Sequence, residues 1–180
     1  MRRRVERLVS AERRVLQDLG SVESSVLDVV LPGLSRAADH GVLWVGMAGG
    51  LALSGRAGRR AAVRGLVALS VASAVSNVLL KRASGRPRPP AGLVPAAREP
   101  RRPPFTTSFP SGHAASAAAF TTAVVLELPW ASVPLVPLSA AVASSRVVIG
   151  VHYPSDVVAG VALGVAAAVV SRRCIGQAGS

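Results

Sequence analysis

Five apolar runs, separated by polar linkers, constrain the fold of this 180-residue chain more than any other feature. They cover about 37–54, 63–80, 113–128, 131–150 and 156–171. As helices they would be about 24–30 Å long at about 1.5 Å per residue, close to the thickness of a bilayer's hydrocarbon core. The sequence therefore predicts an all-α, polytopic membrane helix bundle with about five transmembrane helices.

Composition agrees with a membrane location. Half of the residues are hydrophobic but only 3% are aromatic, and the mean hydropathy is +0.44. Small residues let helices approach closely in lipid, and Gly160 and Gly164 have the small-xxx-small spacing typical of such contacts.

A different pattern occupies residues 5–31, where apolar positions recur at helical spacing opposite a charged face. This segment is too charged to span a bilayer, so we expect an amphipathic interfacial helix that ends at Pro32–Gly33. A soluble tail helix is the alternative. The predicted division is an N-terminal helix at 1–36, a membrane domain at 37–171 and a basic tail at 172–180.

The formal net charge of +12 indicates an anionic partner. Nucleic acid is disfavoured because the chain has few aromatic residues for stacking, and its basic residues interrupt long apolar runs. Lipid headgroups or phosphate substrates fit better. The single cysteine, Cys174, excludes an internal disulfide framework.

Alternation of five spans would bring four linker segments to one membrane face. These segments are 81–89, 110–113, 145–146 and 152–156, and they carry most of the residues capable of chemistry. Asp39 and His40 are interpreted as interfacial or helix-packing residues and Glu127 as a residue that faces lipid headgroups, and none of them is expected to be catalytic.

Each of the first two segments could bind an anion or could have only a structural role. Lys81 and Arg88 could clamp phosphate oxygens, or could only reach out to lipid headgroups. Ser111 is a candidate N-cap, and Gly112 would let a ligand approach the helix N-terminus beside His113. The alternative is a capped helix with an interfacial histidine.

The last two segments suggest a nucleophile. Arg146 lies near the end of an apolar run, where an unpaired charge is costly and an anionic partner is expected. His152 and Asp156 are four residues apart at a helix start, so the carboxylate could orient the imidazole and leave its other nitrogen nucleophilic. A polar helix cap is the alternative.

Together these segments resemble the type 2 phosphatidic acid phosphatase family. Its signature is Lys-x6-Arg-Pro, then Pro-Ser-Gly-His, then Ser-Arg-x5-His-x3-Asp. Here the three parts read KRASGRPRP at 81–89, PSGH at 110–113 and SRVVIGVHYPSD at 145–156.

The resemblance implies a phosphatase that forms a phosphohistidine. His152 would be the nucleophile, Asp156 its partner and His113 the acid and base. Phosphate would be bound by Lys81, Arg88, Arg146 and the backbone near Ser111 and Gly112. Members of the family need no metal or other cofactor, and the chain lacks a clustered carboxylate set for two metals.

The implied partners are a lipid phosphate substrate and membrane lipids, with no nucleic acid. Members usually have six spans, and in size and general composition the chain resembles small actinobacterial members. That likeness favours an isoprenoid-linked substrate, either decaprenylphosphoryl-5-phosphoribose or a polyprenyl diphosphate. Phosphatidic acid and phosphatidylglycerophosphate are the alternative substrates.

Two other functions remain open at this stage. Vanadate-dependent haloperoxidases share this anion pocket, although they are larger and soluble. A basic protein that binds anionic lipids without turnover would not need the His152–Asp156 pair.

Basic residues are more numerous on the side of the expected site, which predicts a cell-membrane protein with a cytoplasmic active site. Members of the family often have the site on the outer face.

Overall fold

The computed structural model describes residues 2–100, 102 and 104–177, with side chains described from residue 8 to residue 174 within those ranges. The described residues form helices and helical turns, with no β-strand among them. In order they are α1 (Arg2–Ser21), η1 (Val26–Val30), α2 (Leu31–Ala37), η2 (Asp39–Gly41), α3 (Val42–Ala52), α4 (Arg56–Ala74), η3 (Val75–Leu80), α5 (Lys81–Ser84), α6 (Gly112–Val125), η4 (Pro129–Ala131), α7 (Ser132–Val148) and α8 (Pro154–Gln177). The prediction of an all-α bundle is confirmed.

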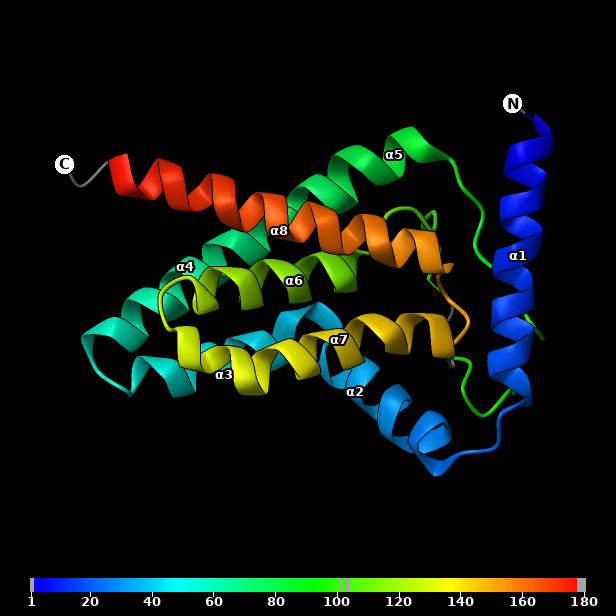
Figure 1. Cartoon of the computed structure of the whole chain (residues 1–180), viewed down its shortest axis with the longest axis horizontal. Helices are drawn as coiled ribbons and strands as arrows, with labels where there is room; N and C mark the ends of the chain where they lie inside the picture. The colour runs from blue at the N-terminus through cyan, green and yellow to red at the C-terminus, as the bar shows by residue number, and fades with distance from the viewer. Residues whose placement is uncertain (1, 101, 103, 178–180) are drawn as a thin grey trace.

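Helix α6 lies at the centre of the bundle. It packs against α4, α7 and α8, which run alongside it, whereas α1 crosses the bundle at one end (Figure 1). Most of its residues are buried, many of them alanines, and the hydrophobicity of α6 is spread around the helix. A helix that is apolar on every side is stable only when it is enclosed, which explains its central position.

Two glycines let α8 lie directly against α6. A Cβ atom added to Gly164 would lie 2.3 Å from the carbonyl oxygen of Ala115, and one added to Gly160 would lie 2.5 Å from that of Ser111. The close contact expected from the small-xxx-small spacing is therefore present.

The two tryptophans lie in contrasting environments. Trp44 of α3 is 1% exposed and packs on Phe120 of α6, with ring centroids 5.3 Å apart. Trp130, in the turn between α6 and α7, is 61% exposed. Trp44 thus ties the short helix α3 to the centre of the bundle.

Three helices are long and apolar enough to cross a membrane: Arg56–Ser84, Pro129–Val148 and Pro154–Cys174. The other two predicted spans form shorter helices. The first is interrupted at His40 and Gly41, which have φ values of 55° and 79°, so α3 has only 11 residues. The third is α6, whose 14 residues are enclosed by other helices. The count of five spans therefore stays a prediction.

The N-terminal segment differs from the single helix expected over residues 5–31. Helix α1 ends at Ser21, and after a break the chain becomes helical again through η1 and α2. Pro32 does not end a helix but lies in the first turn of α2, where its fixed φ and missing N–H are tolerated. At the other terminus α8 continues through residues 172–177, and residues 178–180 of the predicted tail lie outside the described residues.

We expect Gly164→Ala to lower the free energy of unfolding by about 1–3 kcal/mol, because the new methyl group would push α8 away from α6. Thermal unfolding of the purified protein in detergent measures this change. Gly46→Ala, in a helical position with no atom within 4 Å of the added Cβ, is the matched control and should not lower stability. Equal melting temperatures for both variants would contradict the packing argument.

Candidate functional site

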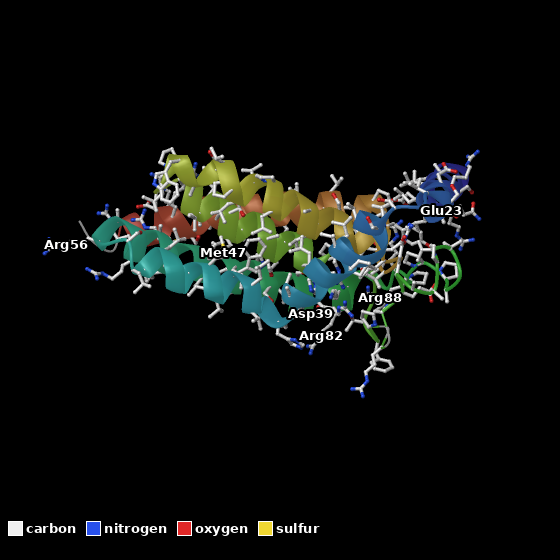
Figure 2. All side chains as sticks on the ribbon, turned by 90° about the horizontal axis from the view of Figure 1, so that it is seen from below. Glu23, Asp39, Met47, Arg56, Arg82 and Arg88 are labelled. Carbon is white, nitrogen blue, oxygen red and sulfur yellow. The ribbon has the colours of Figure 1, made fainter. Side chains whose placement is uncertain are left out.

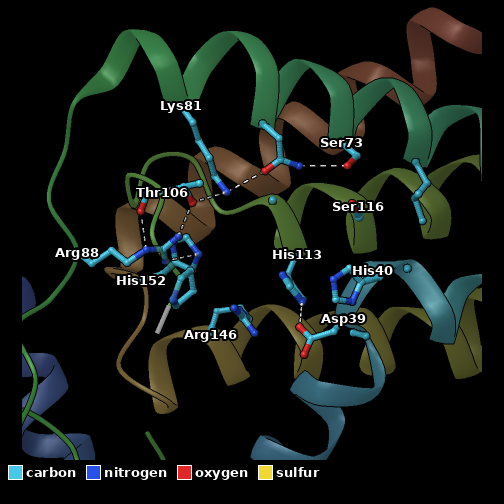
Figure 3. Close-up of a pocket in the computed structure, with 16 residues that line it drawn as sticks. Asp39, His40, Ser73, Lys81, Arg88, Thr106, His113, Ser116, Arg146 and His152 are labelled. Atoms are coloured by element: carbon cyan, nitrogen blue, oxygen red, sulfur yellow. Dashed lines mark hydrogen bonds and ion pairs between the residues drawn. The ribbon is translucent and has the colours of Figure 1, made fainter. Parts of the chain in front are cut away.

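A cavity of about 420 Å³ opens at the end of the bundle where the predicted segments converge. Figure 2 shows Arg88 and Asp39 toward this end and Arg56 at the opposite end. Six of the eight predicted site residues line the cavity, namely Lys81, Arg88, Gly112, His113, Arg146 and His152 (Figure 3). The structure thus brings together residues that are up to 71 positions apart in the chain, from 81 to 152.

His152 lies in the short connection between α7 and α8, just before Pro154 starts α8. Its backbone N–H donates to the carbonyl oxygen of Arg146 (3.1 Å). The carboxylate of Asp156, in the first turn of α8, is fully buried and accepts a hydrogen bond from the N–H of Tyr153 (2.9 Å). The start of α8 therefore fixes the imidazole and the carboxylate relative to each other.

The distance between His152 Nδ1 and Asp156 Oδ2 is 3.6 Å, longer than a hydrogen bond. Nδ1 has no hydrogen-bond partner among the described residues, and Nε2 lies 3.3 Å from Arg88 Nη1. The pKa of His152 is lowered to about 4, chiefly by burial and also by Arg88 and Arg146, while Asp156 opposes the shift. At neutral pH the imidazole is therefore uncharged, as a nucleophile requires.

Three cations of the cavity have no carboxylate within 4 Å among the described residues. Lys81 Nζ donates to Asn77 Oδ1 (2.8 Å), and Arg88 donates to the carbonyl oxygens of Thr106 and Val151 (both 2.8 Å). Arg146 is 6% exposed and donates to the hydroxyl of Ser35. Burial lowers the pKa of Arg88.

Positive charges placed in this way favour an anionic ligand. A buried cation without a carboxylate partner is unstable unless another anion neutralises it. The Nε of Arg146 has no hydrogen-bond partner in the described part of the chain, so a donor is left over for a ligand. A tetrahedral oxyanion in the cavity would satisfy all three cations.

The start of α6 supplies the second histidine. Ser111 is the predicted N-cap: its hydroxyl accepts from the N–H of Ala114 (3.4 Å), and its own N–H donates to the carbonyl oxygen of Asp156 (2.9 Å). Ser111 is fully buried and does not line the cavity. Of the two backbone positions predicted to bind phosphate, Gly112 is therefore the one that faces the cavity.

Asp39 is a site residue that sequence analysis missed. Its Oδ1 lies 2.8 Å from His113 Nε2, so the carboxylate orients this ring. The left-handed conformation of His40 and Gly41 turns the chain sharply and leaves Asp39 at the cavity. A carboxylate beside a histidine at the start of an apolar run was the available signal, but no spacing rule connects it to residue 113.

Residues outside the expected set also shape the cavity. Asn77 and Thr106 hold Lys81 and Arg88 in place, and neither stands at a signature position. Glu127, expected to face headgroups, instead pairs with Arg64. A second cavity, of about 770 Å³, adjoins the first and shares Asp39, Pro104 and Arg146 with it.

The family model for the PAP2 superfamily matches residues 61–180. The chain belongs to the PAP2 superfamily. Decaprenylphosphoryl-5-phosphoribose phosphatase of Mycobacterium tuberculosis is 40% identical over 153 residues, covering 80% of this chain and 81% of that protein. Lipid A 1-phosphatase of Rhizobium johnstonii is 39% identical over 104 residues, covering 53% and 42%.

The fold is also that of a solved PAP2 enzyme. The crystal structure of a transmembrane PAP2-type phosphatidylglycerolphosphate phosphatase from Bacillus subtilis matches with a TM-score of 0.72 at 21% identity, covering 93% of this chain and 86% of that chain. As a PAP2 superfamily member, this chain is a membrane phosphatase that hydrolyses phosphate esters. The two relatives, both phosphatases, favour this activity over the haloperoxidase and non-enzymatic alternatives.

We expect the His152 ring to protonate with a midpoint near pH 4, against 6.5 for an unperturbed histidine. NMR titration of histidine-labelled protein, with His152→Asn to assign the signal, measures the midpoint. Because the folded-state pKa is the lower one, the stability contributed by neutral His152 is complete above pH 6.5 and is lost as the pH falls toward 4. A midpoint at or above 6.5 would contradict the burial argument.

Proposed function

We propose that this PAP2 phosphatase removes phosphate from an isoprenoid-linked lipid through a phosphohistidine on His152. The observation that supports the mechanism is that His152 shares its cavity with a second histidine and with three cations that have no carboxylate partner among the described residues. A buried neutral imidazole beside a place for an oxyanion is the arrangement that nucleophilic attack on phosphorus requires.

In the first step, Nε2 of His152 forms a bond to phosphorus while the bond from phosphorus to the lipid oxygen breaks. His113 donates a proton to this leaving oxygen. Asp156, which faces Nδ1, balances the positive charge of the phosphorylated imidazole. In the second step water attacks phosphorus, His113 accepts its proton, and the nitrogen–phosphorus bond breaks to release inorganic phosphate.

The remaining site residues stabilise the negative charge of the phosphoryl group during its transfer or position the residues that react. Lys81, Arg88 and Arg146 stabilise its equatorial oxygens, and the N–H of Gly112 at the start of α6 adds a donor with the helix dipole behind it. Asp39 keeps the ring of His113 in position through its hydrogen bond to Nε2. No metal enters these steps.

The substrate proposal rests on the relative that is 40% identical over most of both chains, a decaprenylphosphoryl-5-phosphoribose phosphatase. The second cavity supports a substrate with a sizeable polar headgroup, because it adjoins the phosphate site at Asp39 and Arg146. A polyprenyl diphosphate is the other isoprenoid-linked candidate, and phosphatidic acid or phosphatidylglycerophosphate would be the glycerolipid alternatives.

We expect purified protein, assayed with EDTA, to release phosphate fastest from decaprenylphosphoryl-5-phosphoribose within a panel of these four lipids. His152→Ala should lower the rate by a factor of about 10³ or more, because it removes the imidazole that accepts the phosphoryl group. Lipid binding should be retained, since the three cations remain. Phosphate release is measured by a colorimetric assay.

Three outcomes would contradict parts of this proposal. Full activity of His152→Ala would refute the phosphohistidine, and a preference for phosphatidic acid would refute the isoprenoid substrate. Loss of activity in EDTA that Mg²⁺ restores would refute metal independence. Vanadate should inhibit phosphate release, as expected for an anion that occupies the phosphoryl site.

We also propose a cell-membrane location with the site on the cytoplasmic side. The loop beside the cavity is rich in arginine, and Arg82 lies at this end while Arg56 lies at the other (Figure 2). Short loops with excess positive charge tend to stay cytoplasmic. Arg2, Arg3, Arg4 and Arg101 belong to the count made from the sequence, and the structure does not describe their side chains.

Cysteine labelling in intact cells tests the orientation. Ala97 is exposed on the loop beside the second cavity, so Ala97→Cys in a Cys174→Ser background provides one accessible thiol. We expect an impermeant maleimide to label it only after the cells are opened. Labelling in intact cells would place the site on the outer face.

A further inference from the structure

A chain of partly buried ion pairs connects α1 with the carboxylate behind the nucleophile. Arg86 Nη1 donates to Asp156 Oδ1 (2.6 Å) and to the hydroxyl of Ser155 (2.7 Å). Its other terminal nitrogen, Nη2, donates to Glu12 Oε2 (2.5 Å). Glu12 Oε1 in turn accepts from the backbone N–H of Ser155 (2.9 Å), so Glu12 contacts both Arg86 and the start of α8.

The two carboxylates are buried, and the guanidinium between them is partly exposed. Glu12 is 5% exposed and Asp156 is fully buried, while the guanidinium of Arg86 lies over the ring of Tyr153, 4.5 Å from its centroid. Three charged groups packed so closely are stable only in a well-defined geometry, because each would be costly to bury alone.

Neither Glu12 nor Arg86 lines the phosphate cavity. They reach the reacting imidazole only through Asp156, whose Oδ1 binds Arg86 while Oδ2 faces His152 Nδ1 at 3.6 Å. Arg86 lies in the loop after α5, within the spacer of the first signature segment, and Glu12 lies outside the signature on α1. The contact between Glu12 and Arg86, which are 74 positions apart, thus helps to hold Arg86 against Oδ1 of Asp156.

We propose that Glu12 and Arg86 are positioning residues of this phosphatase, which fix the orientation and the effective charge of Asp156 and make turnover depend on the docking of α1. The inference rests on the proposed function of His152. Arg86 attracts electron density from Asp156 and keeps the carboxylate pointing at Nδ1. Glu12 shares the charge of Arg86, so that Asp156 keeps enough negative charge to stabilise the phosphorylated imidazole.

The two residues should therefore affect His152 in opposite directions. Its charged neighbours are Asp156, Arg88 and Arg146, with Lys81 and His113 across the cavity. Removing the positive charge of Arg86 favours protonation of His152, whereas removing the negative charge of Glu12 disfavours it. A residue that only held the helices together elsewhere in the bundle would leave the pKa of His152 unchanged.

The test is steady-state phosphate release over a pH series for Arg86→Gln and Glu12→Gln. We expect kcat to fall about tenfold for Arg86→Gln and about threefold for Glu12→Gln, with KM within about twofold of the original, because neither residue touches substrate. The acidic limb of kcat/KM should move to higher pH for Arg86→Gln and to lower pH for Glu12→Gln. Arg86→Lys, which keeps the charge without the planar fork, should restore the position of the limb.

One control separates positioning from stability. Arg64→Gln removes an ion pair with Glu127 that lies outside both cavities, so it should lower the melting temperature without moving the acidic limb. Leu16→Ala tests the dependence on α1, since Leu16 is fully buried against Val147 and Tyr153 and its loss loosens the docking of α1 without changing a charge. It should move the acidic limb in the same direction as Glu12→Gln, because Glu12 lies on the same helix.

Unchanged kcat and an unmoved limb in Arg86→Gln and Glu12→Gln would overturn the inference, as would shifts of the same sign. If Arg86→Gln does not fold, Glu12→Gln and Arg86→Lys carry the test. Full activity of His152→Ala would instead refute the proposed function itself, so the two failures are distinguishable.

Discussion

Helix α8 can lie against the buried helix α6 only because Gly160 and Gly164 have no side chains. This contact brings the starts of the two helices together, and the N–H of Ser111 donates to the carbonyl oxygen of Asp156 there. His113 and His152 consequently face one cavity although they are 39 positions apart in the sequence, from 113 to 152. The distance between the two imidazoles is thus fixed by packing in the apolar part of the bundle.

The same end of the bundle concentrates positive charge that the carboxylates of the described residues do not fully neutralise. Arg86 and Arg98 have carboxylate partners, namely Glu12 and Asp156 for the former and Asp28 for the latter. Lys81, Arg88 and Arg146 instead donate to neutral oxygens around the cavity. This contrast at one end of the bundle separates the cations that support the structure from those available to an anionic substrate.

The sequence predicted the helical class and the convergence of the three motif segments, because hydrophobic runs and linker order determine topology. It did not predict the interruption at His40 and Gly41, since the left-handed turn depends on local backbone geometry rather than on hydropathy. It also missed Asp39, Glu12 and Arg86. Their partners are 74, 74 and 70 residues distant in the chain, and a contact at such separation leaves no periodic signal in one sequence.

The placement of the two tryptophans gives the protein built-in optical probes. Trp44 is packed on Phe120 between α3 and the central helix, so its emission should be blue-shifted and sensitive to any separation of those helices. Trp130 is exposed in the turn that ends α6, so its fluorescence should respond to the surrounding detergent or lipid. Replacing either one by phenylalanine would leave a single-tryptophan protein in which loosening of the core and changes at the surface can be followed separately.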